Sequence, residues 1–164
     1  FLQPNPRVAG WAYRDLLQGP AAEPLRGELA WDLYAGAGIT TELLRRHFGE
    51  VVACESHPES AALLGVAPSS AEAFLEAQLG ASRLPTVVVA NPPRAGLGEK
   101  VCRSLAELGR RQPALRLQLM SCAPRALAAD LGRLAQVFAV TELRAYDTLP
   151  QTAHVELVAW LQAR

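Results

Sequence analysis

At 164 residues, half of them apolar and a fifth charged, the chain has the size and composition of a single globular domain. Its sixteen basic and sixteen acidic residues cancel, so charge alone does not establish a nucleic-acid partner. No apolar stretch approaches the ~20 residues of a membrane span, and no signal-peptide pattern is present, so we expect no membrane partner and a cytoplasmic location. The cysteines Cys54, Cys102 and Cys122 form no CxxC pair, which argues against a zinc ion or an iron–sulfur cluster.

Short apolar runs and segments with helical spacing alternate along the chain. After a Gly- and Pro-rich stretch at 18–27, four apolar runs have the length of buried strands, and each is followed by a helical pattern. The expected strands are 29–35, 51–55, 86–90 and 115–122, and the expected helices are 39–48, 58–64, 98–108 and 124–134. A weaker strand is expected at 65–70, with a helix at 71–79 after it. This alternation predicts a parallel sheet with helices on both faces.

The pattern changes near the end of the chain. Two consecutive strands, 137–146 and 154–161, are separated only by "DTLPQTA", so they are expected to pair antiparallel. The whole order predicts an α/β fold of the class I methyltransferase (Rossmann-like) type: a doubly wound, mostly parallel seven-stranded sheet with an antiparallel last strand. We expect one catalytic domain over 1–164, with an N-terminal helical lead-in at 1–28 and the sheet core at 29–164.

The ends of the first two predicted strands favour an adenosine-type ligand, because ligands bind beyond the carboxyl edge of an open parallel sheet. In "DLYAGAG" (32–38), Gly36 and Gly38 allow a tight turn and close approach of a ligand. Glu55 lies nineteen positions after Gly36, near the spacing at which an acidic side chain binds ribose hydroxyls. Thr41 replaces the third glycine of the dinucleotide fingerprint, which favours S-adenosylmethionine over NAD. A plain glycine turn with a solvated Glu55 is the alternative.

Asn91, Pro92 and Pro93 follow the predicted strand 86–90 and form a rigid corner. Proline can enter neither the middle of a ladder nor a helix interior, so the two prolines fix the direction of the chain there. Such a corner suits a site that positions a planar substrate beside a methyl donor. A simple strand stop is the alternative.

Two later residues carry possible acid–base or nucleophilic chemistry. Cys122 lies at the start of a predicted helix, where N–H dipoles favour the reactive thiolate. The alternative is burial as a small apolar side chain, the role expected for Cys54 and Cys102. Glu156, in the apolar strand "HVELVAWL", either points to solvent or faces a site that raises its pKa. His154 lies on the same strand face and is interpreted as a positioning group at most.

Six segments, in order over nearly the whole chain, together resemble one family. They are "FLQPN" (1–5), "DLYAGAG" (32–38), "ACES" (53–56), "NPPRAG" (91–96), "SCAP" (121–124) and "DTLPQTAHVE" (147–156). These segments resemble the RNA uridine carbon-5 methyltransferases, which make 5-methyluridine in tRNA and rRNA. The last two segments are far more specific than a pair of glycines.

The resemblance implies a mechanism and a set of contacts. Cys122 would attack carbon 6 of the uracil, carbon 5 would take the methyl group of S-adenosylmethionine, and Glu156 would remove the carbon-5 proton. The expected cofactor contacts are Gln3, Tyr34, Gly36, Gly38, Glu55 and Asn91, and the expected substrate-positioning residues are Pro92, Pro93, Arg94 and His154. The implied partner is a tRNA or rRNA whose target base is flipped out of its stack. No metal and no protein partner is predicted.

The chain departs from the family pattern at several positions. Asn91 replaces an acidic residue and loses its charge, from which we expect weaker activity. Ala123, Ala126 and Ala129 replace polar residues near the nucleophile, and Ile39 stands where the family often has an asparagine. Accessory RNA-binding parts are absent, and the chain starts with Phe rather than Met, so a fragment or a minimal form is expected.

Two alternatives to the carbon-5 mechanism stay open on the sequence. The Asn91-Pro92-Pro93 corner also occurs in methyltransferases that act on nitrogen, although Arg94 stands where those enzymes place an aromatic residue. Alternatively, the domain is a degenerate binding module that keeps the fold, and with it S-adenosylmethionine or RNA binding, without turnover. Asn91 and the three alanines motivate this second alternative.

Overall fold

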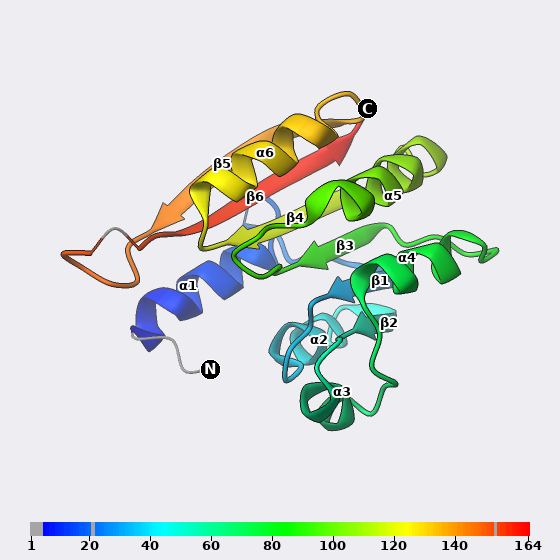
Figure 1. The fold of residues 1–164 in the computed structure, drawn as a ribbon, viewed down its shortest axis with the longest axis horizontal. Helices are drawn as coiled ribbons and strands as arrows, with labels where there is room; N and C mark the ends of the chain where they lie inside the picture. Colours follow the sequence, from blue (N-terminus) through cyan, green and yellow to red (C-terminus); the bar gives the residue numbers. More distant parts are fainter. Residues whose placement is uncertain (1–4, 21, 153) are drawn as a thin grey trace.

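The computed structural model describes residues 5–20, 22–152 and 154–164. Its first half contains α1 (Pro6–Leu16), β1 (Gly27–Leu33), α2 (Ile39–Leu44), β2 (Phe48–Cys54), α3 (Pro58–Leu64) and α4 (Ala71–Leu79). Its second half contains β3 (Val87–Ala90), α5 (Gly98–Arg111), β4 (Arg116–Ser121), α6 (Pro124–Leu134), β5 (Phe138–Tyr146) and β6 (Glu156–Ala163). Within these residues one six-stranded sheet has the order β2-β1-β3-β4-β6-β5 (Figure 1).

Helices cover both faces of the sheet, as predicted. Figure 1 shows α4, α5 and α6 on one face, whereas α1 and α2 pack on the other. The strand β3, with the sequence VVVA, is buried at every position. Val88 and Ala90 belong to the core beneath α4–α6, and Val87 and Val89 belong to the core beneath α1 and α2. Burial on both faces explains why this strand is continuously apolar rather than alternating.

The mostly parallel topology with one reversed strand is confirmed. β1 pairs in parallel with β2 and β3, and β3 pairs in parallel with β4. β6 runs antiparallel to both of its neighbours, β4 and β5. The last strand therefore enters the sheet from the opposite end.

The predicted seventh strand is wrong, because the segment 65–70 forms no strand. Gly65 ends α3 in the left-handed conformation, with a φ of 71°, and Pro68 has no N–H to give to a ladder. The backbone N–H of Ser69 donates to the carbonyl of Glu55 over 2.8 Å, beyond the end of β2. This single hydrogen bond beyond the end of β2 does not make the segment 65–70 a strand of the sheet. The boundary near Phe48 also differs: this residue begins β2 instead of ending a helix.

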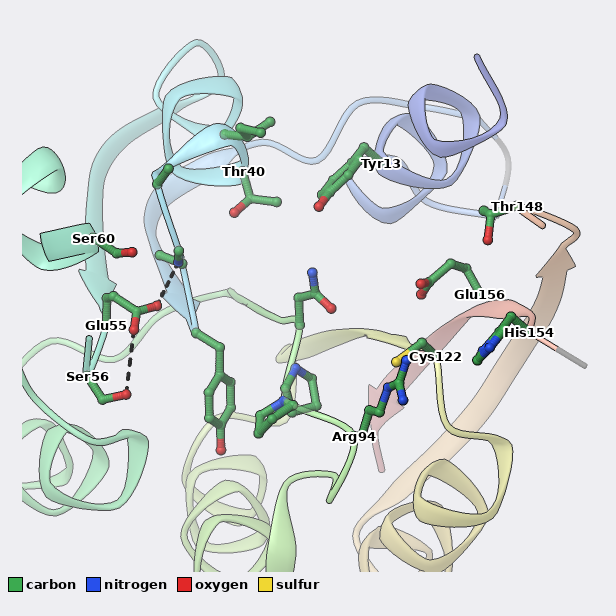
Figure 2. Close-up of a pocket in the computed structure, with 18 of the residues that line it drawn as sticks. Tyr13, Thr40, Glu55, Ser56, Ser60, Arg94, Cys122, Thr148, His154 and Glu156 are labelled. Atoms are coloured by element: carbon green, nitrogen blue, oxygen red, sulfur yellow. Dashed lines mark hydrogen bonds between the residues drawn. The ribbon is translucent and has the colours of Figure 1, made fainter. Parts of the chain in front are cut away.

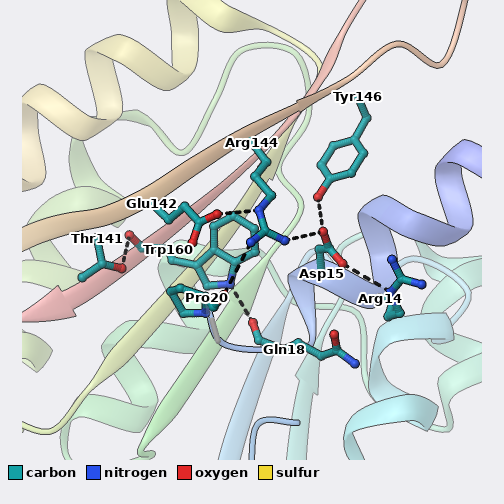
Figure 3. Close-up of polar contacts among 9 residues, drawn as sticks. All are labelled: Arg14, Asp15, Gln18, Pro20, Thr141, Glu142, Arg144, Tyr146 and Trp160. Atoms are coloured by element: carbon teal, nitrogen blue, oxygen red, sulfur yellow. Dashed lines mark hydrogen bonds and ion pairs between the residues drawn. The ribbon is translucent and has the colours of Figure 1, made fainter. Parts of the chain in front are cut away.

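α1 is attached to the β5–β6 hairpin by a polar cluster around Asp15 (Figure 3). One oxygen of the Asp15 carboxylate accepts hydrogen bonds from Arg144 over 2.8 Å and from the Tyr146 hydroxyl over 2.6 Å. The Arg144 guanidinium lies 5.1 Å from the centre of the Trp160 ring, and the indole N–H of Trp160 donates to the carbonyl of Gln18. This cluster fixes the position of α1, whose other residues reach the site described below.

Burial alone would raise the pKa of Asp15, but the hydrogen bonds from Tyr146 and Arg144 outweigh it and lower the pKa. Burial, together with the hydrogen bond to Asp15, raises the pKa of the Tyr146 hydroxyl. Asp15 is therefore ionised over the whole neutral range. The cluster is a charged and hydrogen-bonded attachment, stronger than an exposed ion pair.

We expect Tyr146→Phe to reduce the free energy of unfolding by about 1 kcal/mol, because it removes a hydrogen bond to a largely buried carboxylate. Arg14→Gln is the matched control, since Arg14 pairs with the same carboxylate but is 57% exposed, and it should cost less than about 0.5 kcal/mol. Urea denaturation at neutral pH measures both. Equal effects of the two changes would contradict the assigned role of Tyr146.

Candidate active site

One cavity of about 710 Å³ opens at the carboxyl edge of the parallel strands (Figure 2). It brings together most of the residues singled out from the sequence: Tyr34, Gly36, Glu55, Asn91, Pro92, Pro93, Arg94, Cys122, His154 and Glu156. Gly38 does not line it, and Gln3 lies outside the described residues. Figure 2 shows Glu55, Ser56 and Ser60 at one end of the cavity and Arg94, Cys122, His154 and Glu156 at the other. The cavity therefore has two separate polar ends.

The turn after β1 is held directly against Glu55. The backbone N–H of Gly36 donates to Oε2 of Glu55 over 2.8 Å, and the backbone N–H of His57 donates to Oε1 over 2.7 Å. Gly36 has a φ of 57°, and a Cβ added there would meet open space. Gly38 has a φ of 89°, and a Cβ there would lie 2.5 Å from the Leu64 side chain. The first glycine leaves room for a ligand, whereas the second permits close packing of the turn on α3.

A buried carboxylate supports the same turn from below. Asp32, at 1% exposure, accepts hydrogen bonds on Oδ2 from the hydroxyls of Thr40 and Thr41, each over 2.6 Å. Burial raises the pKa of Asp32 to about 6, although the two hydroxyls lower it. Thr41, which takes the place of the third glycine of a dinucleotide fingerprint, thus has its own role in joining α2 to β1.

The Asn91-Pro92-Pro93 corner lies beside the end of β1. The N–H of Asn91 donates to the carbonyl of Leu33 over 3.4 Å, and the N–H of Gly96 donates to the carbonyl of Pro93 over 2.8 Å. Pro92 is buried, whereas Pro93 is exposed and lines the cavity. The corner is thus tied to β1 at its start and closed by a turn at its end.

Cys122 and Glu156 lie next to the last paired residues of two neighbouring strands. In the antiparallel pairing of β4 with β6, the last pair is Ser121 with Leu157. Cys122 directly follows Ser121 and Glu156 directly precedes Leu157, so both residues lie at the same edge of the sheet. Figure 2 shows both side chains at the same end of the cavity. Burial raises the pKa of the half-buried Glu156, which suits a general base working near neutral pH.

The three cysteines have different environments. Burial raises the pKa of Cys54 to about 11 and that of Cys102 to about 12, so both stay as inert thiols. Cys122 is only partly buried and lines the cavity. Its turn is held by the Ser121 hydroxyl, which accepts a hydrogen bond from the N–H of Ala123 over 3.1 Å. Among the described cysteines, Cys122 alone faces the site.

Sequence reasoning missed several residues of the cavity. Tyr13 reaches it from α1 (Figure 2), and nothing in the local sequence indicates that the first helix contributes to the site. Ser56 follows Glu55 directly, so the rule that used strand ends could have found it. Thr148 lies inside the segment that carried the family resemblance. Ala123, Ala126 and Ala129 do not line the cavity, and Ala129 faces solvent.

The second half of the chain, residues 75–164, matches the model of the tRNA (uracil-5-)-methyltransferase family. The match covers more than half of the 164 residues. The chain belongs to this family. The resemblance drawn from the sequence segments is thereby confirmed.

Similar proteins cover nearly all of this chain. The uncharacterized RNA methyltransferase SCO5901 of Streptomyces coelicolor is 32% identical, over 99% of this chain and 37% of that protein. The 23S rRNA (uracil(747)-C(5))-methyltransferase RlmC of Shewanella sp. strain W3-18-1 is 30% identical, over 98% of this chain and 42% of that protein. The chain thus spans about two fifths of the length of these curated relatives.

Solved structures share the fold. The Pyrococcus abyssi tRNA (uracil-54, C5)-methyltransferase in complex with S-adenosyl-L-homocysteine gives a TM-score of 0.66 at 24% identity, over 98% of this chain and 40% of that one. The N-methyltransferase NodS of Bradyrhizobium japonicum with the same ligand gives 0.71 at 14% identity, over 97% of this chain and 88% of that one. The fold is that of the class I S-adenosylmethionine-dependent methyltransferases.

No three His, Cys, Asp or Glu side chains in the described part of the chain lie close enough together to hold a metal ion. No helix in the same part is long and apolar enough to cross a membrane.

We expect the stability of the protein to fall as the pH rises from about 4 to 6, because folded Asp32 has a pKa of about 6 and the unfolded residue one near 3.8. At a pH above both pKa values, the free energy of unfolding should be lower by roughly 3 kcal/mol than at a pH below both. Asp32→Asn should remove this pH-dependent loss. Urea denaturation of wild type and variant at pH 4 and pH 7 measures it. The exposed Asp147 supplies the control: Asp147→Asn should keep the pH dependence of the wild type, and a similar dependence in Asp32→Asn would contradict the assignment.

Proposed function

We propose that this chain is the methyl-transferring domain of an S-adenosylmethionine-dependent RNA uridine carbon-5 methyltransferase. The observation that supports the proposal is that Cys122 and Glu156, the neighbours in sequence of the paired Ser121 and Leu157, line one end of a cavity whose other end is lined by Glu55. Family membership supports it. Relatives that cover this chain are named for methylation of uracil carbon 5 in rRNA, and a solved protein of this fold for the same reaction in tRNA.

The end of the cavity near Glu55 fits an adenosine-type cofactor. Oε1 of Glu55 accepts hydrogen bonds from the N–H of His57 and, over 3.5 Å, from the Ser56 hydroxyl. Among the described residues, Oε2 accepts a hydrogen bond only from the N–H of Gly36 and so has a further lone pair for a ribose hydroxyl. The backbone at Gly36 adjoins open space, so a ligand can approach it closely. Ile39 lines the cavity while 59% exposed, and a bound ligand that covered it would remove apolar surface from water. Tyr34 is a further lining residue at this turn.

When bound, S-adenosylmethionine supplies a methyl group activated by a sulfonium. At the opposite end of the cavity, the Cys122 thiolate forms a bond to carbon 6 of the uracil, and carbon 5 becomes nucleophilic. Carbon 5 takes the methyl group, and the electron pair of the broken bond stays on the donor sulfur. Glu156 then accepts the carbon-5 proton, the ring double bond forms again and the thiolate leaves. Cys122 is restored for the next cycle.

Four residues are proposed to position the base rather than react with it. Pro92 and Pro93 fix the corner that faces Cys122, and Arg94 offers guanidinium donors to uracil carbonyls or to a neighbouring phosphate. His154 lies two residues before Glu156, at the same end of the cavity (Figure 2). Asn91, at the corner itself, offers a neutral amide where the family has an acid.

We propose that the substrate is a tRNA or an rRNA. A base must leave its stack to enter the cavity, because the ring carbon cannot be reached inside a helix. The curated relatives are more than twice as long as this chain.

For the cofactor, we expect calorimetry with S-adenosyl-L-homocysteine to show binding to the 164-residue chain. Glu55→Gln should weaken this binding about tenfold, because a charged acceptor for ribose hydroxyls becomes neutral. Glu59→Gln is the control, since Glu59 is exposed on α3 outside the cavity. A wild type that gives no binding heat would overturn the cofactor assignment.

For the covalent step, the reaction can be trapped with a single-stranded RNA oligonucleotide that contains 5-fluorouridine, because fluorine at carbon 5 cannot leave as a proton. With S-adenosylmethionine present, wild type should form an RNA–protein adduct detectable by denaturing electrophoresis and mass spectrometry. Cys122→Ala should form none, and Cys54→Ala should form it normally because the Cys54 thiol does not line the cavity.

The base is tested with ordinary uridine RNA in the same assay. Glu156→Gln should accumulate a methylated adduct, because the carbon-5 proton then has no acceptor, whereas wild type should release its product. Methyl label on a nitrogen would favour a nitrogen-directed enzyme. Cofactor binding without adduct or methyl transfer would favour a binding module without turnover, and either result would contradict the proposal.

A further inference from the structure

A buried carboxylate outside the cavity connects two of its walls. Asp130, on α6, is 2% exposed. Its Oδ2 accepts a hydrogen bond from the backbone N–H of Leu97 over 2.7 Å. Its Oδ1 accepts from the N–H of Gly98 over 3.3 Å and from the Arg133 guanidinium over 2.9 Å, and the Cys102 thiol lies 3.6 Å from it. Buried ionised groups persist only where they are satisfied in this way.

The backbone that Asp130 binds is the end of the loop that begins with Asn91. This loop, residues 91–98, contains the Pro92-Pro93 corner and closes through the bond from Gly96 to Pro93. A Cβ on Gly96 would lie 2.4 Å from Oδ2 of Asp130, and Gly96 has a φ of 82°. The loop therefore lies directly against α6, and both its conformation and this contact require glycine.

The helix that carries Asp130 begins directly after the nucleophile. Pro124 is the first residue of α6 and Cys122 lies two residues before it. Asp130 follows less than two turns later on the same helix. Ala126, one turn before Asp130, faces the same glycine of the loop, at 3.2 Å from the position of its added Cβ. One rigid element thus joins the wall that carries Cys122 to the wall that carries the proline corner.

We propose that Asp130 is a positioning residue for the methyl-transfer site. By holding the loop 91–98 against α6, it sets the separation between the Asn91-Pro92-Pro93 corner and the Cys122 thiol. This inference rests on the proposed function, because the consequence of the separation is the rate at which the thiolate reaches carbon 6. We call the two hydrogen bonds that Asp130 accepts from Leu97 and Gly98 the clamp. At the other end of the cavity, Glu55 follows β2 and is held instead by the N–H groups of Gly36 and His57.

The clamp also satisfies N–H groups at the start of α5. Leu97 occupies the N-cap position of this helix, and its apolar side chain cannot accept a hydrogen bond from them. A capping role and a positioning role make different predictions. Loss of a cap alone lowers the stability of the protein. Loss of the clamp also slows the covalent step in protein that is fully folded, and slows it more than it weakens cofactor binding.

The experiment compares Asp130→Ala, Asp130→Asn and Arg133→Gln with wild type, at a temperature where circular dichroism shows all four to be folded. With 5-fluorouridine RNA and saturating S-adenosylmethionine, Asp130→Ala should form the adduct at least about tenfold more slowly, because a small misplacement of reacting groups has a large effect on rate. Asp130→Asn should recover part of the rate, since its amide oxygen still accepts from Leu97. Arg133→Gln, which removes only the exposed partner of the carboxylate, should stay within about twofold.

Two readouts separate the clamp from a general loss of structure. Affinity for S-adenosyl-L-homocysteine should fall much less than the rate in Asp130→Ala, because Glu55 is held by the N–H groups of Gly36 and His57. Hydrogen exchange in a peptide covering 91–98 should become faster. An unchanged rate in folded Asp130→Ala, unchanged exchange in this loop, or a loss of affinity as large as the loss of rate would each overturn the inference. A wild type that forms no adduct would overturn the proposed function alone, and loop exchange would still decide whether Asp130 holds the loop.

Discussion

β1 lies between β2 and β3, so the chain leaves β1 toward one side of the sheet and later returns on the other side. The loops after β1 and β3 diverge at this point, and their divergence opens a crevice at the carboxyl edge. The turn with Gly36 borders the crevice from one strand and Asn91 borders it from the other. If β6 ran parallel to β4, its first residue would lie at the opposite edge of the sheet from Cys122. Because β6 runs antiparallel, its first residue, Glu156, lies at the same edge as Cys122, next to the pair Ser121–Leu157.

The substitution of an acid by Asn91 has two opposite electrostatic consequences for this site. A carboxylate at position 91 would attract a sulfonium, and its loss removes that attraction. It would also be a third acid in a cavity that already contains Glu55 and Glu156, and like charges raise one another's pKa values. With an amide at this position, burial accounts for the raised pKa of Glu156. In the proposed mechanism, the neutral side chain would weaken the attraction for the methyl donor but would leave Glu156 easier to ionise.

Strands and helices were predictable where burial or chain breakers determine them. The run VVVA shows burial on both faces, and Pro124 marks the start of α6 after Cys122. Strand-end reasoning also identified part of the cavity, including Gly36, Glu55 and Cys122. Prediction from the sequence failed where a contact between distant parts of the chain determines the structure. The segment 65–70 is extended in pattern but has no strand beside it. Tyr13 lines the cavity because α1 packs on the sheet, and Asp130 is indistinguishable in sequence from a solvated helix residue.

The attachment of α1 is linked to the site through one strand pair. Tyr146, which donates to Asp15, lies opposite Glu156 in the pairing of β5 with β6. Glu156 in turn directly precedes Leu157, the residue of β6 that lies opposite Ser121 on β4. A displacement of α1 would therefore act on both sides of the cavity, through Tyr13 directly and through Tyr146 on the strand beside Glu156. The charged cluster around Asp15 is in this sense part of the support of the site, because it holds the first helix and the reversed strand in a single arrangement.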